Sequence, residues 1–157
     1  MPTVGLRQQK KPVSKVILDT SAFLAFANRE TGAERVRPLL KESVVSTVNA
    51  AEILQKLVTK NMTLSRAEEY LKRFVSDIPP FDLEQAALTA TLHSQTREFG
   101  LSLGDRACLA LGMQLGLPIM TADQVWLKLG LGISIELIRE SRGFFASEKN
   151  GRSIVSF

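Results

Sequence analysis

Short apolar runs alternate with longer segments of helical periodicity along the chain, and this alternation predicts the fold class. The apolar runs at 13–18, 43–46, 117–121 and 132–137 predict strands. Between them, apolar residues recur every three or four positions and predict helices over 22–28, 32–41, 48–60, 63–75, 83–99 and 104–115, with one or two further turns over 124–129. Strands that alternate with helices indicate an α/β fold built on a mainly parallel sheet.

Proline and glycine mark the ends of several predicted elements. Pro38 predicts a bend or break in the helix over 32–41, because proline lacks the backbone N–H that a helix uses. Gly100 occupies the usual position of a C-terminal helix cap. The segment 78–81 contains two prolines and is therefore an edge strand at best.

The length and composition indicate one domain. The chain has 157 residues, of which 45% are hydrophobic and 23% charged, as in soluble globular proteins. No internal repeat or linker divides the core, so we expect a basic, flexible arm over 1–12, one domain over 13–140 and a tail over 141–157. The tail either packs on the domain or binds a partner, and its bulkiest side chains are Phe144 and Phe145.

The sequence also bears on location. No apolar run approaches the roughly 18 residues of a membrane span, and the basic N-terminus is not followed by the apolar segment of a secretion signal. The single cysteine, Cys108, excludes an intrachain disulfide, which is compatible with a reducing compartment. We therefore expect a cytoplasmic protein without a membrane partner.

The net charge and the single histidine restrict the class of chemistry. A formal net charge of +4 favours a polyanionic partner such as nucleic acid, although many basic proteins bind none. His93 is the one histidine, and it lies in a predicted helix remote from any nucleophile motif. A Ser-His-Asp or Cys-His mechanism is therefore excluded, and so is a structural zinc site that needs several His or Cys ligands.

Four acids are predicted to gather at one edge of the sheet. Asp19 and Asp123 each follow a predicted strand, and the carboxyl ends of parallel strands share one edge. Glu52 and Asp105 lie near the start of helices that begin at the same edge. Ligands of open α/β sheets bind at this edge. We therefore predict an acidic cluster there.

Each of these acids also has a simpler structural interpretation. Asp19 and Asp123 are placed to cap the helical turns that follow them. Ser102 with Asp105 resembles a capping box. Glu52 lies opposite the predicted apolar stripe of its helix and four residues before a lysine, the spacing of a surface ion pair. That stripe consists of Ala50, Ala51, Ile53, Leu54, Leu57 and Val58.

A cluster of four carboxylates needs bound protons or a counterion, because the charges repel one another. Helix N-termini offset about 0.3–1 kcal/mol each, whereas a divalent cation offsets far more. Because the cluster offers oxygen donors and no His or Cys, Mg²⁺ or Mn²⁺ fits it better than zinc. In a basic protein such a site suggests phosphodiester hydrolysis, in which the metal activates water and neutralises charge in the transition state.

Four segments around these acids carry a resemblance to a known family. They are VILDTSA at 16–22, STVNAAEI at 46–53, LGDRACLA at 103–110 and LPIMTAD at 117–123. Each segment alone is a weak signal, but four in register are specific. On this evidence, residues 14–137 resemble the PIN-domain ribonucleases, most closely the VapC toxins of prokaryotic toxin–antitoxin pairs.

The resemblance implies a fold, an activity and partners. The implied fold is a three-layer α/β/α sandwich with a central, mainly parallel sheet, often in a homodimer. The implied activity is Mg²⁺- or Mn²⁺-dependent cleavage of RNA. A small antitoxin, bound over or near the site, is implied to hold the toxin inactive.

The resemblance also assigns roles to individual residues. The family's acidic quartet corresponds to Asp19, Glu52, Asp105 and Asp123. The three aspartates are implied to hold the metal directly or through water, while Glu52 helps to hold it or orients the attacking water. Ser21 and Thr121 match polar positions beside the acids and are implied to orient them.

Three functions stay open at this point. The first is a metal-dependent endoribonuclease of VapC type. The second is a non-catalytic module that keeps the PIN fold and binds RNA or protein. The third is another metal-dependent phosphoesterase, such as one that acts on DNA or small phosphates. Arg97 and Arg106 are candidates for phosphate contacts by their proximity to the acidic edge, with solvated surface positions as the alternative.

Overall fold

The computed structural model describes residues 15–140 of the 157. The arm expected over 1–12 and the tail expected over 141–157, with Phe144 and Phe145, lie outside the described residues, so the expectations for them stay predictions. Across the described part of the chain, no helix combines the length and the apolar character that crossing a membrane requires.

Four short strands form one parallel sheet in the order β2-β1-β3-β4. They are β1 (Val16–Leu18), β2 (Ser43–Val44), β3 (Ile119–Thr121) and β4 (Ile135–Leu137). The parallel sheet that the sequence predicts is confirmed, although each strand is shorter than its apolar run. Because β1 and β3 are adjacent and central, the residues that follow these two strands lie side by side at one edge of the sheet.

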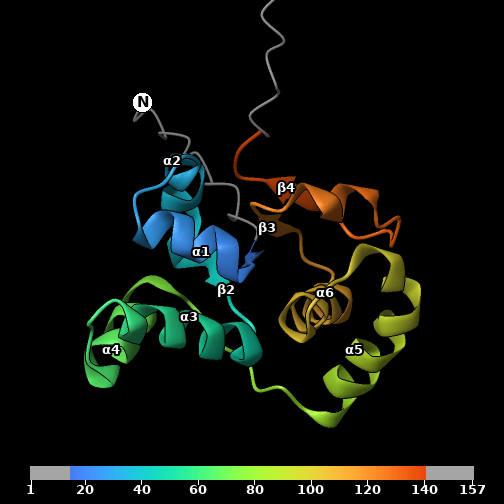
Figure 1. Ribbon diagram of the computed structural model, residues 1–157, viewed down its shortest axis with the longest axis horizontal. Helices are drawn as coiled ribbons and strands as arrows, with labels where there is room; N and C mark the ends of the chain where they lie inside the picture. Colours follow the sequence, from blue (N-terminus) through green and yellow to red (C-terminus); the bar gives the residue numbers. More distant parts are fainter. Residues whose placement is uncertain (1–14, 141–157) are drawn as a thin grey trace, which may run out of the picture.

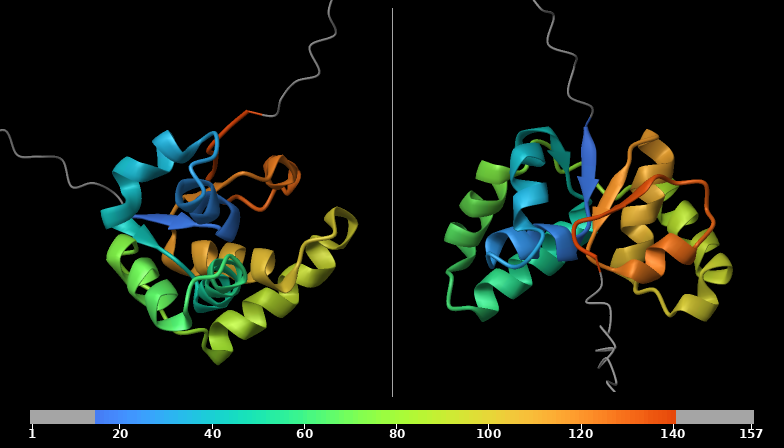
Figure 2. Two further views of the ribbon diagram at one scale, coloured as in Figure 1. Left: turned by 60° about the vertical axis from the view of Figure 1, so that its left-hand side comes forward. Right: turned by 90° about the horizontal axis from the view of Figure 1, so that it is seen from above.

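Helices cover both faces of the sheet and confirm the three-layer α/β/α sandwich (Figures 1 and 2). One layer consists of α1 (Thr20–Ala27), α2 (Ala33–Val36), α3 (Thr47–Thr59) and α4 (Leu64–Phe74). The other layer contains α5 (Leu83–Gln95) and α6 (Leu103–Leu115). In the right-hand view of Figure 2, β1 stands between the two helical layers.

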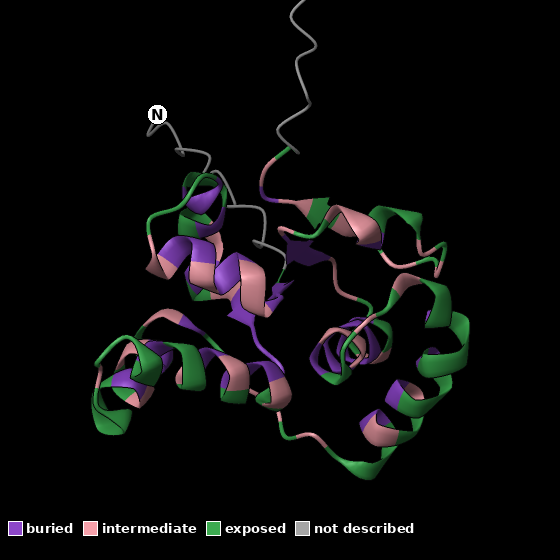
Figure 3. Cartoon of the chain, in the orientation of Figure 1, coloured by how far each residue is buried: buried purple, intermediate pink, exposed green. Residues whose placement is uncertain are grey.

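The two layers enclose separate cores, because side chains alternate between the faces of each strand. Leu18 and Met120 join the core beneath α1 to α4. Ile17 and Ile119 join the core beneath α5 and α6. Figure 3 shows β1, β2, β3 and most of α6 as buried, whereas the outer faces of α4 and α5 are exposed. α6 is therefore packed into the interior along most of its length.

The break predicted at Pro38 is confirmed. The helix expected over 32–41 is α2 followed by a 3-10 helix, η1 (Arg37–Glu42), because the proline supplies no N–H to an α-helical ladder. The segment 78–81 forms no strand, and sheet pairing there is limited to an isolated bridge from Asp77 to β2. Its two prolines cannot donate to a ladder, which explains the difference.

The helix expected over 83–99 is shorter than predicted. α5 ends at Gln95, and Thr96 Oγ1 donates to the backbone carbonyl four residues earlier at 2.7 Å. A short 3-10 helix, η2 (Arg97–Phe99), follows and ends at Gly100. That glycine has a left-handed φ of 64°, as the predicted cap requires.

Candidate active site

Asp19 lies at the junction between β1 and α1 and is only 4% exposed. Its Oδ2 accepts hydrogen bonds from Ser21 Oγ at 2.6 Å and from Thr121 Oγ1 at 2.9 Å. It also caps α1 by accepting from the Ser21 backbone N–H at 3.4 Å. Burial raises the pKa of Asp19 to about 6, with the charge of Asp105 adding to the rise and the two hydroxyls opposing it. The side chain therefore links β1 to β3 and carries an ionisation that the fold disfavours.

Thr121, the last residue of β3, connects Asp19 to Asp123. Its buried Oγ1 donates to Asp19 and accepts from the Asp123 backbone N–H at 3.1 Å. Asp123 is exposed and caps the 3-10 helix η3 (Gln124–Lys128), with Oδ1 accepting from the Val125 N–H at 3.0 Å. The turns predicted over 124–129 are therefore a 3-10 helix. Thr121 Oγ1 connects the two aspartates, because it hydrogen-bonds to the Asp19 carboxylate and to the Asp123 backbone.

Asp105 belongs to a complete capping box at the start of α6. Its Oδ2 accepts from the Ser102 N–H at 2.8 Å, and its own N–H donates to Ser102 Oγ at 3.1 Å. Burial raises the pKa of Asp105, and the negative charges of Glu52 and Asp123 raise it further. The charge of Asp105 also raises the pKa of Asp19. Asp105 therefore interacts electrostatically with each of the other three acids.

Glu52 occupies a different environment from the one its helix pattern predicts. Its Oε1 accepts from Thr20 Oγ1 at 2.8 Å and from Asn49 Nδ2 at 2.9 Å. The interpretation of Glu52 as half of a surface ion pair with Lys56 is wrong, since the ion pairs of the described residues do not include it. Thr20 adjoins Asp19, so these contacts bring Glu52 to the acidic edge.

The predicted apolar stripe of α3 is partly wrong. Ala51 is exposed and Val58 is 42% exposed, whereas Asn49 is completely buried. The buried face of α3 is therefore rotated toward Asn49 in its first turns. The sequence analysis missed this residue, and the signal available was a polar side chain three positions before Glu52 at the start of an apolar helix.

The four carboxylates share one feature. Each has one oxygen held by donors of the described residues, while no such donor reaches its second oxygen. The held atoms are Oδ2 of Asp19, Oε1 of Glu52, Oδ2 of Asp105 and Oδ1 of Asp123. Capping and site formation are therefore compatible, because a carboxylate has two oxygens and a cap needs only one.

The sequence model of the PIN domain matches residues 16–130. The chain belongs to the PIN-domain family. The match covers β1, β2 and β3 and includes all four acids, whereas β4 lies beyond it. No curated protein matches the chain significantly.

Several solved structures share this PIN fold. A toxin–antitoxin complex from Klebsiella pneumoniae has a TM-score of 0.65 at 17% identity, over 80% of this chain and 99% of that chain. A DNA-bound VapBC from Salmonella typhimurium has a TM-score of 0.62 at 19% identity, over 81% and 100%. VapBC-5 from Mycobacterium tuberculosis has a TM-score of 0.56 at 24% identity, over 82% and 100%. At these identities the likeness concerns the fold.

The donor chemistry of this PIN domain fits a hydrated divalent cation. Within residues 15–140, no three or more His, Cys, Asp or Glu side chains lie together so that they could hold a metal ion between them. Mg²⁺ does not require such an enclosure, because it keeps several waters and binds through one or two carboxylates. The acids offer oxygens only, which suits Mg²⁺ or Mn²⁺ and not a closed zinc site.

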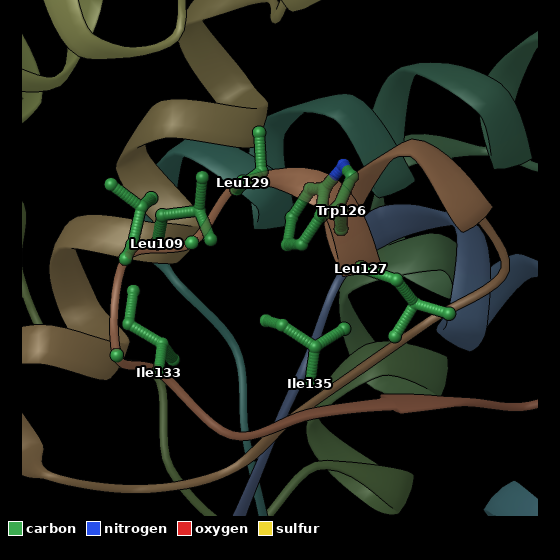
Figure 4. A pocket seen from close by; sticks show the side chains of 9 residues that line it. Leu109, Trp126, Leu127, Leu129, Ile133 and Ile135 are labelled. Atoms are coloured by element: carbon green, nitrogen blue, oxygen red, sulfur yellow. The ribbon is translucent and has the colours of Figure 1, made fainter.

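Other candidate residues lie apart from the acids. His93 and Arg97 are exposed. Arg106 donates from Nη1 to the Thr89 carbonyl at 2.9 Å and so connects α6 to α5. An apolar cavity of about 230 Å³ beneath η3 is lined by Trp126 and neighbouring leucines and isoleucines, and none of the four acids borders it (Figure 4). This cavity is separate from the acidic edge.

Proposed function

We propose that this PIN domain is a Mg²⁺- or Mn²⁺-dependent endoribonuclease of VapC toxin type. The observation that carries the proposal is the arrangement of its four carboxylates, each anchored by one oxygen with the other oxygen free of described donors. Helix capping alone does not explain why Asp105 lies close enough to Asp19, Glu52 and Asp123 for the negative charges to raise the pKa values of Asp19 and Asp105. A divalent cation removes this repulsion and supplies Lewis-acid chemistry to phosphodiester hydrolysis when bound.

The residues divide the work of the site. Asp19, Asp105 and Asp123 would hold the cation directly or through water, and Glu52 would help to hold it or orient the attacking water. The hydroxyls beside Asp19, those of Ser21 and Thr121, orient its carboxylate. Phosphoryl chemistry depends on positioning and charge stabilisation more than on a covalent nucleophile, which agrees with a site made only of acids and hydroxyls.

Attraction of RNA is assigned to the ends of the chain. Residues 15–140 carry 14 Lys and Arg against 15 Asp and Glu, so the net charge of +4 arises from residues 1–14 and 141–157. Basic side chains that neutralise phosphates supply the sequence-independent part of RNA affinity. Lys10 and Lys11 belong to the first of these segments and are proposed phosphate contacts.

A groove on the α1–α4 layer suits the proposed antitoxin partner. The cavity measures about 800 Å³ and lies between α1, η1 and α4. Its lining combines three aromatic rings and four cations, with no acid among the described residues, and includes Phe26, Tyr70, Phe74, Arg29, Arg37, Lys41 and Arg73. Charge complementarity therefore favours an acidic peptide segment with apolar anchors as the occupant.

We further propose a cytoplasmic homodimer, as the family resemblance implies.

The test is cleavage of a defined RNA by the purified full-length protein. We expect cleavage with Mg²⁺ or Mn²⁺, loss of cleavage with EDTA, and at least a hundredfold loss in Asp19→Asn and Asp105→Asn. Glu68→Gln is the matched control, because the Glu68 side chain on α4 is 46% exposed and pairs only with Lys72 in the described structure. Metal-dependent cleavage that survives both substitutions would contradict the proposal. RNA or protein binding without any cleavage would favour the non-catalytic module.

A further inference from the structure

Asn49 is a fully buried polar side chain beside the acidic site, and the proposed function gives it no role. It lies one helical turn before Glu52 on α3. Its Nδ2 lies 2.9 Å from Glu52 Oε1, 3.1 Å from Thr20 Oγ1 and 3.2 Å from the Gly104 carbonyl oxygen. Its Oδ1 is buried and has no hydrogen-bond partner in the described structure. An unsatisfied buried oxygen is unfavourable. The same orientation of the amide places its nitrogen within hydrogen-bonding distance of three acceptors.

Thr20 reaches the same oxygen of Glu52 from another element. Its Oγ1 donates to Glu52 Oε1 at 2.8 Å and accepts from Asn49 Nδ2. Thr20 of α1 and Asn49 of α3, which are 29 positions apart in sequence, therefore both donate hydrogen bonds to Glu52 Oε1. Two donors on a single oxygen fix the carboxylate more firmly than either donor alone.

Gly104 forms the third side of this arrangement. A Cβ at this position would lie 2.6 Å from Glu52 Cδ and 2.7 Å from Oε2, closer than real Cβ contacts allow. Any larger residue would therefore displace the Glu52 carboxylate, and glycine lets the first turn of α6 approach it in its observed position. Asn49 spans the same gap, since it bonds both the Gly104 carbonyl and Glu52. The three residues link the two helical layers around Glu52.

We propose that Asn49 and Thr20 are positioning residues that hold Glu52 by Oε1, so that only Oε2 serves the cation or the attacking water. This inference rests on the proposed function. It explains why an amide occupies a buried position beside a carboxylate: a donor is needed there, and a second carboxylate would repel the first. It also explains why a glycine directly precedes Asp105 in the first turn of α6.

The test uses single-turnover cleavage of RNA by the full-length protein. Asn49→Leu and Thr20→Val each remove a donor to Glu52, and each is expected to lower the cleavage rate about 10–100-fold, the usual effect of losing a partner that orients a ligand. The KM for RNA is expected to stay unchanged. Thr59→Val is the matched control, because Thr59 Oγ1 bonds only the Gln55 carbonyl at the exposed end of α3.

A double-mutant cycle separates positioning from a general structural role. If Asn49 acts through Glu52, Asn49→Leu will lower the rate of the wild-type protein but will have no further effect on Glu52→Gln. Leucine also removes the unsatisfied Oδ1, so the urea midpoint is expected to change little. If that variant nevertheless loses stability, Thr20→Val tests the same oxygen from a half-buried position in the first turn of α1.

The outcomes distinguish this inference from the proposed function. If the wild-type protein shows no metal-dependent cleavage, both fail. If the wild-type protein cleaves and Glu52→Gln loses the rate, while Asn49→Leu and Thr20→Val keep it, the positioning role is overturned and the nuclease stands. Rate losses that add fully to those of Glu52→Gln would overturn the positioning role in the same way.

Discussion

Replacement of Asp19 by asparagine is expected to stabilise the metal-free protein at neutral pH. The carboxyl is 4% exposed, and burial raises its pKa from 3.8 to about 6. Asparagine has nearly the same shape and keeps one oxygen that can accept from Ser21 and Thr121. The substitution therefore removes the unfavourable buried charge while it preserves the hydrogen bonds of the junction.

The magnitude follows from linkage between folding and ionisation. A folded-state pKa above the unfolded value means that the protonated carboxyl is favoured in the folded protein, so the benefit is complete below pH 4 and is lost as the pH rises through about 6. A rise from 3.8 to about 6 at roughly 1.4 kcal/mol per pKa unit corresponds to about 3 kcal/mol. Asp19→Asn is therefore expected to raise the free energy of unfolding by about 3 kcal/mol at pH 7.5 and by little at pH 4.

The assay is urea unfolding in EDTA at several pH values between 4 and 8. Trp126 is the single tryptophan and is 1% exposed, so its fluorescence reports loss of the core directly. The difference between the two proteins should grow as the pH rises from 4 to 7. A difference that is independent of pH, or a variant less stable than the wild-type protein at pH 7.5, would refute the reasoning.

Three further predictions follow from the same structure. Millimolar Mg²⁺ should raise the unfolding midpoint of the wild-type protein at pH 7.5 but not that of Asp19→Asn, because a cation that binds the folded protein raises its stability. Equal shifts in the two proteins would contradict a role for this carboxylate. Gly32→Ala should lower the free energy of unfolding by about 1–3 kcal/mol in urea titrations, because φ is 99° and a Cβ would lie 2.7 Å from the Ile138 carbonyl oxygen. Lys10→Ala with Lys11→Ala should weaken RNA binding and reduce the slope of log affinity against log salt by about 0.7 per lysine, with the single-turnover rate at saturating RNA unchanged; an unchanged slope would count against these contacts.

Much of the fold follows from local patterns. Alternation of apolar runs and helical segments predicts the parallel sheet and its two helical layers, because each pattern reflects the burial of one element. The break at Pro38 and the cap at Gly100 are likewise local, since each depends on the backbone of one residue. The same holds for Asp19 and Asp123, whose position after strands predicts the edge at which they lie.

The environment of Glu52 could not be predicted in this way. Periodicity treats α3 as if one stripe were buried along its whole length, whereas the first turns of the helix face Gly104 of α6, 55 residues beyond Asn49. In this arrangement Asn49 is buried, Ala51 is exposed and Glu52 accepts a hydrogen bond from Thr20 of α1. Contacts between distant segments decide these details, and one sequence contains no direct signal for them.

The sequence presents helix capping and a functional site as alternatives for each acid, but the two roles are compatible. Asp19, Asp105 and Asp123 all cap helical turns, as the simpler interpretation states. The structure shows that each does so with one oxygen only. Which oxygen is held depends on side-chain geometry, which residue spacing does not specify.

The central claim is that the acids act as one cation site, and binding of Mn²⁺ measured by electron paramagnetic resonance tests it most directly. Asp105 interacts electrostatically with Asp19, Glu52 and Asp123, so it is the residue whose charge should matter most. We predict saturable Mn²⁺ binding to the wild-type protein and to Glu68→Gln, and at least a tenfold weaker affinity in Asp105→Asn. Wild-type affinity in Asp105→Asn, or no saturable binding to the wild-type protein, would contradict the account.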